Sequence, residues 1–230
     1  MKRAYKIGIR QLQLEIEREY GVWINRKRIH RIKREAGIET YIRKKRTKYQ
    51  MNSVPHTVFP NILNREFTAS RPMEKVVTDI TQINIAGGQK VYLIAFKDLY
   101  DKSIISYEVS SNLNLNFVNK ALKRVLNKKR KGESLLIHSD QGGQFISRIY
   151  VRTLKENNVI QSMSRRGNCW DNAPIESFFG LLKDHLEPKK AKNLEGIKKH
   201  VARKIFYYNH ERPQLGLKKM SPVEYRRHAA

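Results

Sequence analysis

The stretch KVVTDITQINIAGGQKVYLIAFKDLYDKSIISYEVS, residues 75–110, decides the fold. It contains three runs of β-branched and aromatic residues, at 75–83, 90–98 and 103–110, separated by the short polar segments AGGQ and LYDK. Runs of this kind with turn residues between them are typical of neighbouring antiparallel strands. The sequence therefore predicts an antiparallel meander of three strands.

The pattern changes after residue 110. Apolar residues at helical spacing predict helices at 113–129, 144–158, 173–187 and 193–212, and short apolar runs predict strands at 134–140 and 159–164. A meander followed by alternating helices and strands predicts an α/β fold, in which a mixed sheet is flanked by helices.

The first 50 residues form a different kind of segment, with 16 Lys and Arg against 5 Glu. Two short helices are expected there, with their buried sides formed by Ile9, Leu12, Ile16 and Tyr20 and then by Ile29, Ile32 and Ala36. This pair fits a helix-turn-helix-like DNA-binding segment, in which Arg26, Lys27, Arg28 and Arg31 are candidate DNA contacts. A solvated basic helical hairpin is the alternative.

Three domains are predicted along the chain. Residues 1–50 are the basic helical segment, and residues 51–72, which contain three prolines, are a linker. Residues 73–230 are the third and largest domain, with a helical extension at its C-terminal end.

The charge balance indicates the partner. The chain of 230 residues has 47 Lys and Arg against 21 Asp and Glu, a net charge of +26. This excess favours a nucleic acid as partner over an anionic membrane surface, because no strongly amphipathic basic helix stands out. The single cysteine, Cys169, excludes a disulfide framework, and the apolar run at 91–96 is too short to cross a bilayer. A cytoplasmic protein is expected.

Three acids occupy unusual places. Asp79 interrupts a predicted strand, Asp140 ends another, and Glu176 lies in the first turn of a predicted helix. Each has an ordinary explanation: a core acid paired with Lys or Arg, a turn residue, and an acid favoured by the helix dipole. Brought together at the exposed ends of strands, the three carboxylates are suitable ligands for a hard divalent cation, because such cations prefer oxygen ligands. Two such ions promote the breaking and joining of phosphodiesters.

The spacing of these acids resembles a known family. Thirty-five residues separate Asp140 from Glu176, and Lys183 follows Glu176 by seven. The segments VTDIT, IHSDQGGQF, SMSRRGNCWDNAPIESFFGLLK and YYNHERPQLGLKKMSPVEY also resemble those of transposases of the bacterial IS-three insertion-sequence family, which share their core with retroviral integrases. The resemblance extends over nearly the whole chain and implies that residues 73–230 are an integrase-type catalytic core with a C-terminal helical extension.

The resemblance implies a ribonuclease-H-like fold with a five-stranded sheet, and a transposase that cuts and joins DNA. Asp79, Asp140 and Glu176 would be the catalytic acids and the ligands of two Mg²⁺ ions, for which Mn²⁺ is expected to substitute. The implied partners are double-stranded DNA of the element ends and of the target, further copies of the chain on DNA, and the product of an upstream reading frame. The chain opens within the family's second helix-turn-helix segment, so a downstream-frame product shortened at its start is expected.

Other basic residues are candidate DNA contacts. Lys183 lies two helical turns after Glu176, and Arg165 and Arg166 belong to the loop before that helix. Trp170 of the same loop is expected to pack into the core rather than to stack on a base. Two other functions remain open: a catalytically silent DNA-binding regulator of transposition, and a nuclease acting on RNA–DNA hybrids, which leaves the basic helices unexplained.

Overall fold

The computed structural model describes residues 7–38 and 59–228, which form two compact units. Residues 59–205 form the sheet unit. Residues 7–38 and 206–228 form the terminal unit, so that the described parts nearest the two ends of the chain belong to one body. Among the described residues, no helix combines the length and the apolar character needed to cross a membrane.

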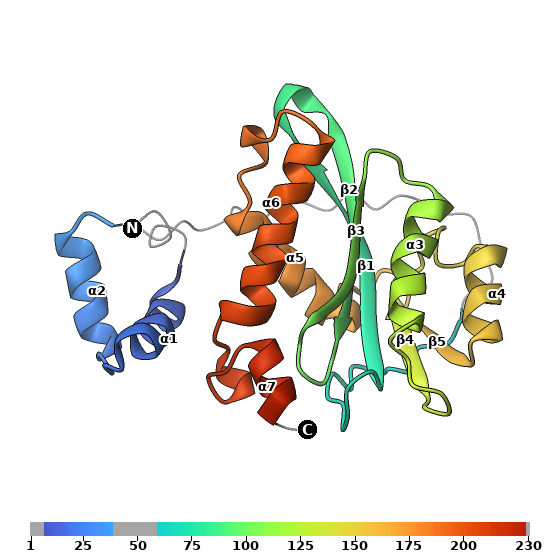
Figure 1. Cartoon of the computed structure of the whole chain (residues 1–230), viewed down its shortest axis with the longest axis horizontal. Coiled ribbons are helices and arrows are strands. Elements are labelled where there is room, and N and C mark those ends of the chain that lie inside the picture. The colour runs from blue at the N-terminus through green and yellow to red at the C-terminus, as the bar shows by residue number, and fades with distance from the viewer. Residues whose placement is uncertain (1–6, 39–58, 229–230) are drawn as a thin grey trace. The chain divides into compact units, whose positions relative to one another are not determined.

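The sheet unit is built on a mixed five-stranded sheet with the order β3–β2–β1–β4–β5 (Figure 1). The meander consists of β1 (Lys75–Asn84), β2 (Lys90–Asp98) and β3 (Ile104–Ser110), which pair antiparallel. β4 (Leu135–Ser139) and β5 (Val159–Met163) continue the sheet from β1 in parallel. The predicted meander and mixed sheet are confirmed.

Helices cover both faces of this sheet (Figure 1). On one face lie α3 (Leu115–Leu126) and α4 (Arg148–Glu156), and on the other lie α5 (Ala173–His185) and α6 (Leu194–Phe206). All four were predicted. The last was expected to reach residue 212; α6 ends at Phe206, a π-helical turn continues to Glu211, and Arg212 is extended because a proline follows it.

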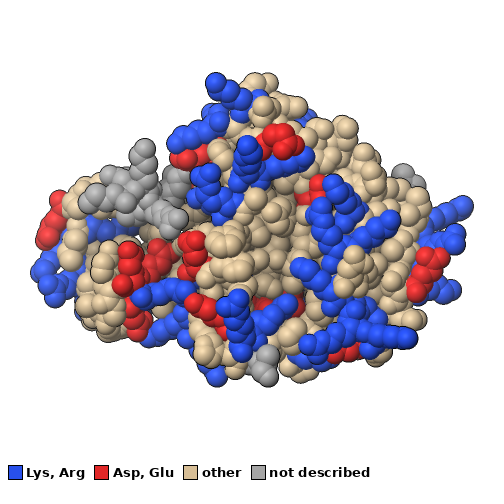
Figure 2. All heavy atoms as spheres, in the orientation of Figure 1, with Lys and Arg blue, Asp and Glu red and all other residues tan. Residues whose placement is uncertain are grey.

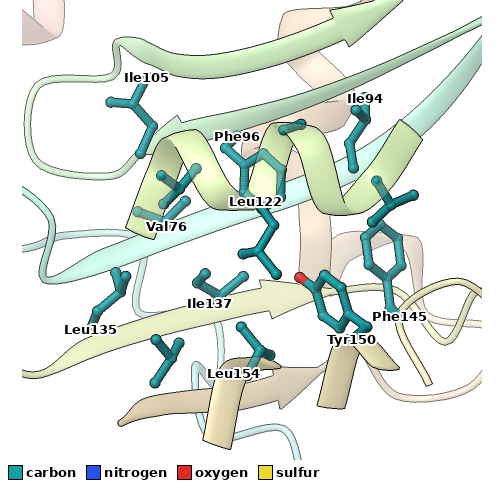
Figure 3. Packing of buried hydrophobic residues seen from close by; sticks show 14 of the residues in the cluster. Val76, Ile94, Phe96, Ile105, Leu122, Leu135, Ile137, Phe145, Tyr150 and Leu154 are labelled. Carbon is teal, nitrogen blue, oxygen red and sulfur yellow. The ribbon is translucent and has the colours of Figure 1, made fainter. Parts of the chain in front are cut away.

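The main core lies between the sheet and the first pair of helices (Figure 3). Leu122 of α3 packs with Val76 of β1 and Ile137 of β4, and Leu154 of α4 joins the same cluster. Since successive strand residues point to opposite faces, the residues between these core positions point toward α5. This alternation decides which face of the sheet receives the polar side chains of β1 and β4.

Residues 59–72 of the predicted linker belong to the sheet unit and contact its other parts. Leu63 is buried and its amide donates to the Ser162 hydroxyl over 3.0 Å. Arg71 pairs with Glu133 over 2.9 Å. Residues 51–58 lie outside the described residues, and the three-domain division stays a prediction.

The terminal unit contains two helices from the start of the chain, α1 (Ile9–Tyr20) and α2 (Arg26–Glu35). Its C-terminal part, which we call the C-terminal segment (residues 206–228), contains a π-helical turn (Tyr207–Glu211) and the short helix α7 (Pro222–His228). The predicted helix pair is confirmed.

The predicted buried sides of α1 and α2 were partly wrong. Ile29 is buried as expected, but Tyr20 and Ile32 are exposed. Gln13 and Lys33 are buried in their place. The physical reason is that α2 contains few apolar residues. The hydrocarbon stem of Lys33 therefore covers apolar surface that Ile32 was expected to cover.

Candidate active site

Asp79 lies on β1, and Asp140 directly follows the adjacent parallel strand β4. In the β1–β4 ladder Val77 is opposite His138. Asp79 and Asp140 each follow by two residues, so both continue the row of side chains that faces α5. Parallel strands lie about 4.8 Å apart, which makes the two acids neighbours. The predicted pair therefore meets at the point where β4 ends.

Backbone amides orient both carboxylates. The amide of Ile80 donates to Asp79 Oδ1 over 2.7 Å, and the amide of Gly142 donates to Asp140 Oδ1 over 3.0 Å. Asp79 is half-buried and Asp140 is exposed. The turn after β4 thus presents the Asp140 carboxylate to solvent in a defined orientation.

Helix α5, which carries Glu176, packs against β1, the strand that carries Asp79. At its start, the Asn172 side-chain amide donates to the Thr78 carbonyl over 3.0 Å. Toward its end, the Lys183 ammonium donates to the Thr81 hydroxyl. Glu176 follows Asn172 by four residues and precedes Lys183 by seven, so all three lie on one side of the helix. The helix is attached to β1 on both sides of Glu176, and Glu176 faces the strand that carries Asp79.

The side chains of the three acids do not converge on one point. Across residues 7–38 and 59–228, no three His, Cys, Asp or Glu side chains gather closely enough to hold a metal ion. The backbone therefore brings the three acids to one region, whereas a shared ion requires side-chain rotation toward it.

A buried carboxylate, Asp171, organises the loop before α5. Arg165 donates to it from its backbone amide and from two guanidinium nitrogens, over 2.8 to 3.0 Å. Arg65 adds a bond of 2.8 Å and Asn61 one of 3.0 Å. The hydrogen bonds from Arg165 hold the pKa of Asp171 well below its ordinary value. Sequence reasoning missed this role, because an acid just before a helix is ordinary capping chemistry.

His138 supports the site from inside. Its ring nitrogens lie 2.8 Å from the Ser162 hydroxyl and 3.0 Å from the Ser164 hydroxyl. Burial lowers the pKa of His138 to about 4, so the imidazole is neutral at neutral pH. Ser162 of the neighbouring strand β5 and Ser164, which follows it, thus satisfy a neutral histidine.

The basic residues near the acids have different surroundings. Arg165 is held by Asp171, whereas Arg166 and Lys183 are exposed. Trp170 is 70% exposed, so the expectation that it packs into the core was wrong. The turn Cys169–Asn172 holds it outward, because Asp171 and Asn172 occupy the buried positions of that turn.

The basic residues predicted on α2 all face solvent. Arg26, Lys27, Arg28 and Arg31 are exposed, and the Asn25 side chain caps the helix by accepting the Lys27 amide over 2.9 Å. A cavity of about 720 Å³ lies beside this end of α2, lined by Ile9, Arg10, Gln13, Trp23, Asn25, Arg26, Lys27 and His30. Lys and Arg also outnumber acids on the face shown in Figure 2. These surfaces attract a polyanion.

Comparison with family models gives matches over most of the chain. Residues 69–169 and 157–222 match two models described as integrase core domain, and residues 2–46 match one described as HTH-like domain. The helix-turn-helix-like segment and the integrase core predicted from the sequence are thereby confirmed.

Curated relatives span nearly the same length. The chain is 39% identical over 222 residues to the putative transposase InsK of insertion sequence element IS150 from Escherichia coli K12, covering 96% of this chain and 77% of that one. It is 39% identical over 204 residues to a transposase-like protein of Haemophilus influenzae, covering 88% of this chain and 93% of that one.

Solved structures share the fold. The integrase catalytic core of HTLV-2 in complex with magnesium superposes with a TM-score of 0.55 at 14% identity, covering 68% of this chain and 98% of that one. A chain of a simian T-cell lymphotropic virus intasome gives a TM-score of 0.60 at 14% identity, covering 76% of this chain and 60% of that one. The sheet unit therefore has the ribonuclease-H-like fold of retroviral integrase cores.

Proposed function

The chain belongs to the integrase-core transposases of the bacterial IS-three insertion-sequence family, and we propose that it cleaves DNA at element ends and joins them to target DNA through Asp79, Asp140 and Glu176. The observation that carries this proposal is the parallel register of β1 and β4, in which Val77 lies opposite His138, two residues before Asp79 and Asp140 respectively. The attachment of α5 to β1 on both sides of Glu176 supports it for the third acid.

The donor set fits a divalent metal. Three carboxylates offer only oxygen ligands, which Mg²⁺ prefers, and exposure of Asp140 leaves room for the water that Mg²⁺ retains. Two Mg²⁺ ions, or Mn²⁺ in their place, would make the attacking oxygen more acidic and neutralise the charge on the leaving oxygen.

The surrounding residues would orient the DNA. Lys183 lies on the same side of α5 as Glu176, and its ammonium is suited to a phosphate next to the reacting one. Arg166 is exposed on the loop that Asp171 holds, and Arg165 extends from the same loop. These contacts would fix the phosphodiester in line with the attacking oxygen.

Double-stranded DNA of element ends and target is the proposed partner. Arg26, Lys27, Arg28 and Arg31 of α2 would contact it, in keeping with the HTH-like match and the net charge of +26. Several copies of the chain would assemble on DNA, together with the upstream-frame product of the element.

A catalytically silent DNA-binding regulator is the alternative. It is favoured by one observation, namely that the three acids do not converge on one point in the described residues.

A metal-dependence assay distinguishes the two. Purified full chain is incubated with double-stranded DNA that carries an element end, with Mg²⁺, with Mn²⁺, or with EDTA. We expect nicking with either metal and none with EDTA, since the acids need the cation to act on phosphate. Binding without nicking under both metals would support the regulator.

Gly142 provides a finer test of the Asp140 position. A Cβ atom at residue 142 would lie 3.0 Å from Asp140 Oδ1, whereas one at Gly143 would meet nothing within 4 Å. We expect Gly142→Ala to shift the carboxylate by a few tenths of an ångström and to lower the cleavage rate about tenfold, because catalysis depends steeply on position. Gly143→Ala is the matched control, and the comparison is made in single-turnover cleavage. Equal rates for the two variants would mean that the orientation of Asp140 is irrelevant.

A further inference from the structure

One side of α1 binds the C-terminal segment. Gln11, Glu15 and Arg18 follow one another at intervals of four and three residues and so share one side of the helix. The Gln11 amide donates to the Pro213 carbonyl over 3.2 Å, and the Tyr207 hydroxyl donates to Glu15. These partners are 202 and 192 positions apart in the chain, yet all four residues belong to the terminal unit.

The strongest contact of this interface joins Arg18 to Glu224. Two guanidinium nitrogens of Arg18 bind the two oxygens of Glu224, over 2.8 and 2.5 Å. The Ser221 amide adds a bond of 2.8 Å to the same carboxylate. The hydrogen bonds from Arg18 lower the pKa of Glu224 to about 2. The pair therefore stays charged on both sides throughout the neutral range.

Lys219 makes a second charged contact and reaches the turn between α1 and α2. Its ammonium lies 2.7 Å from Glu17 Oε1 and 4.6 Å from the centre of the Trp23 ring. The C-terminal segment thus contacts α1 along its length and also the turn that sets the angle between the two helices.

The helix pair has little core of its own. Within residues 7–38, the buried apolar side chains are Ile7, Leu14 and Ile29. So few buried side chains cannot hold two helices in a defined arrangement, because small units bury too little surface. The C-terminal segment adds Tyr208 and Leu217 as buried side chains of the same unit.

The interface leaves the basic side of α2 exposed. The contacts engage Glu15 and Glu17, two acids of α1 that would otherwise repel a polyanion. In the part of the chain that the structure describes, the contacts above join the C-terminal segment to α1 and the interhelical turn, whereas Arg26, Lys27, Arg28 and Arg31 all face solvent. The C-terminal segment thus pairs Glu17 with Lys219, hydrogen-bonds Glu15 through Tyr207, and leaves the basic side of α2 exposed.

We propose that residues 206–228 are the third element of the DNA-binding unit: they hold α1 and the interhelical turn so that the basic side of α2 faces double-stranded DNA. The inference rests on the proposed DNA binding by α2. It assigns to the C-terminal segment a role in DNA affinity that is separate from the catalytic acids.

A charge swap in the full chain tests this proposal. The variants are Arg18→Glu, Glu224→Arg and the double variant, measured by fluorescence anisotropy with a double-stranded oligonucleotide. We expect each single variant to weaken binding about tenfold, since repulsion replaces a two-bond ion pair, and the double variant to return to within about twofold of the wild type. Net charge alone predicts something else: Glu224→Arg adds positive charge and would tighten binding.

A matched pair controls for charge. Arg152 and Glu156 form an exposed ion pair of 2.7 Å on α4 of the sheet unit, so Glu156→Arg adds the same charge without touching the interface. It is expected to bind DNA at least as tightly as the wild type. The proposal would be overturned if the DNA affinities of the single variants at 18 and 224 simply followed net charge. It would also be overturned if the double variant bound DNA no more tightly than the single variants.

Hydrogen exchange gives a readout that does not depend on DNA. We expect amides of residues 9–20 to exchange faster in both single variants and to regain protection in the double variant, while the sheet strands stay unchanged. Loss of protection without any change in DNA affinity would overturn the proposed role. Wild-type chain that binds no DNA, with the exchange pattern as expected, would overturn the proposed function instead.

Discussion

Replacement of Asp140 by Asn is expected to lower the rates of DNA cleavage and strand transfer by at least about a thousandfold. The amide has the shape of the carboxylate but lacks the negative charge that a divalent ion requires. Its oxygen can still accept the Gly142 amide, and residue 140 is exposed, so neither the turn nor the fold should suffer. DNA affinity, measured by anisotropy without metal, should stay within about twofold of the wild type.

Variants of the other two acids make this prediction specific. Asp79→Asn and Glu176→Gln should show losses of similar size, and the double variant Asp79→Asn with Asp140→Asn should lose little more than either single, because the acids act as a unit. Asp184→Asn, at the other acid of α5, is the control and should keep full activity. Full cleavage activity in Asp140→Asn would remove Asp140 from the site.

The strands and helices of the sheet unit were predictable because local pattern decides them. Runs of β-branched, aromatic and apolar residues predicted β1 and β4, whereas the face that receives the acids follows from the folded sheet, in which Val76 and Ile137 point into the main core and their neighbours point away. Glu176 was predicted to be the third acid of the site only because of its spacing to Asp140. Nothing in the local pattern distinguishes it from an acid that merely suits a helix dipole.

The terminal unit was less predictable because distant residues decide it. The side of α1 that matters carries Gln11, Glu15 and Arg18, whose partners lie about 190 to 210 positions further along the chain. Polar residues at helical spacing look like a solvated surface when the partner is unknown. The apolar stripe that was expected to be buried therefore ended in an exposed Tyr20.

The loop before α5 was mispredicted for a related reason. Trp170 looked like a core residue because large aromatic side chains usually pack. The loop is instead held by Asp171, whose partners Arg65 and Asn61 come from a segment expected to be a linker. Ion-pair partners remote in sequence carry no periodic signal, so only the folded chain reveals them.

Replacement of Asp171 by Asn is therefore expected to have the second large effect, on stability and on catalysis together. The variant loses charge-assisted bonds from Arg165 and Arg65, and we expect a loss of about 2 kcal/mol in the free energy of unfolding at pH 7. This loss of stability is smaller than for a fully buried ion pair, because both arginine side chains are about half exposed and can hydrogen-bond to water in the variant. Urea unfolding at pH 7 measures it.

Glu156→Gln is the matched control for Asp171→Asn. It breaks an Arg–carboxylate bond of similar length whose two partners are exposed, so a change within about 0.5 kcal/mol is expected. In cleavage assays Asp171→Asn should be slower about tenfold or more. The loop leads directly into Asn172, which attaches the start of α5 to β1, and a looser loop lets Glu176 move away from Asp79. A variant that loses stability but cleaves at the wild-type rate would limit Asp171 to folding.

The pH dependence separates the charge of Asp171 from its shape. Because Arg165 lowers the pKa of Asp171 in the folded chain below the ordinary value of 3.8, its stabilising contribution is complete above that value and is lost as the pH falls below it. The difference in unfolding free energy between wild type and Asp171→Asn should thus be constant from pH 7 to about pH 5. It should shrink at pH 3, since the wild-type carboxylate then takes up protons on unfolding. A difference that stays unchanged at pH 3 would mean that the loop depends on the shape of residue 171 and not on its charge.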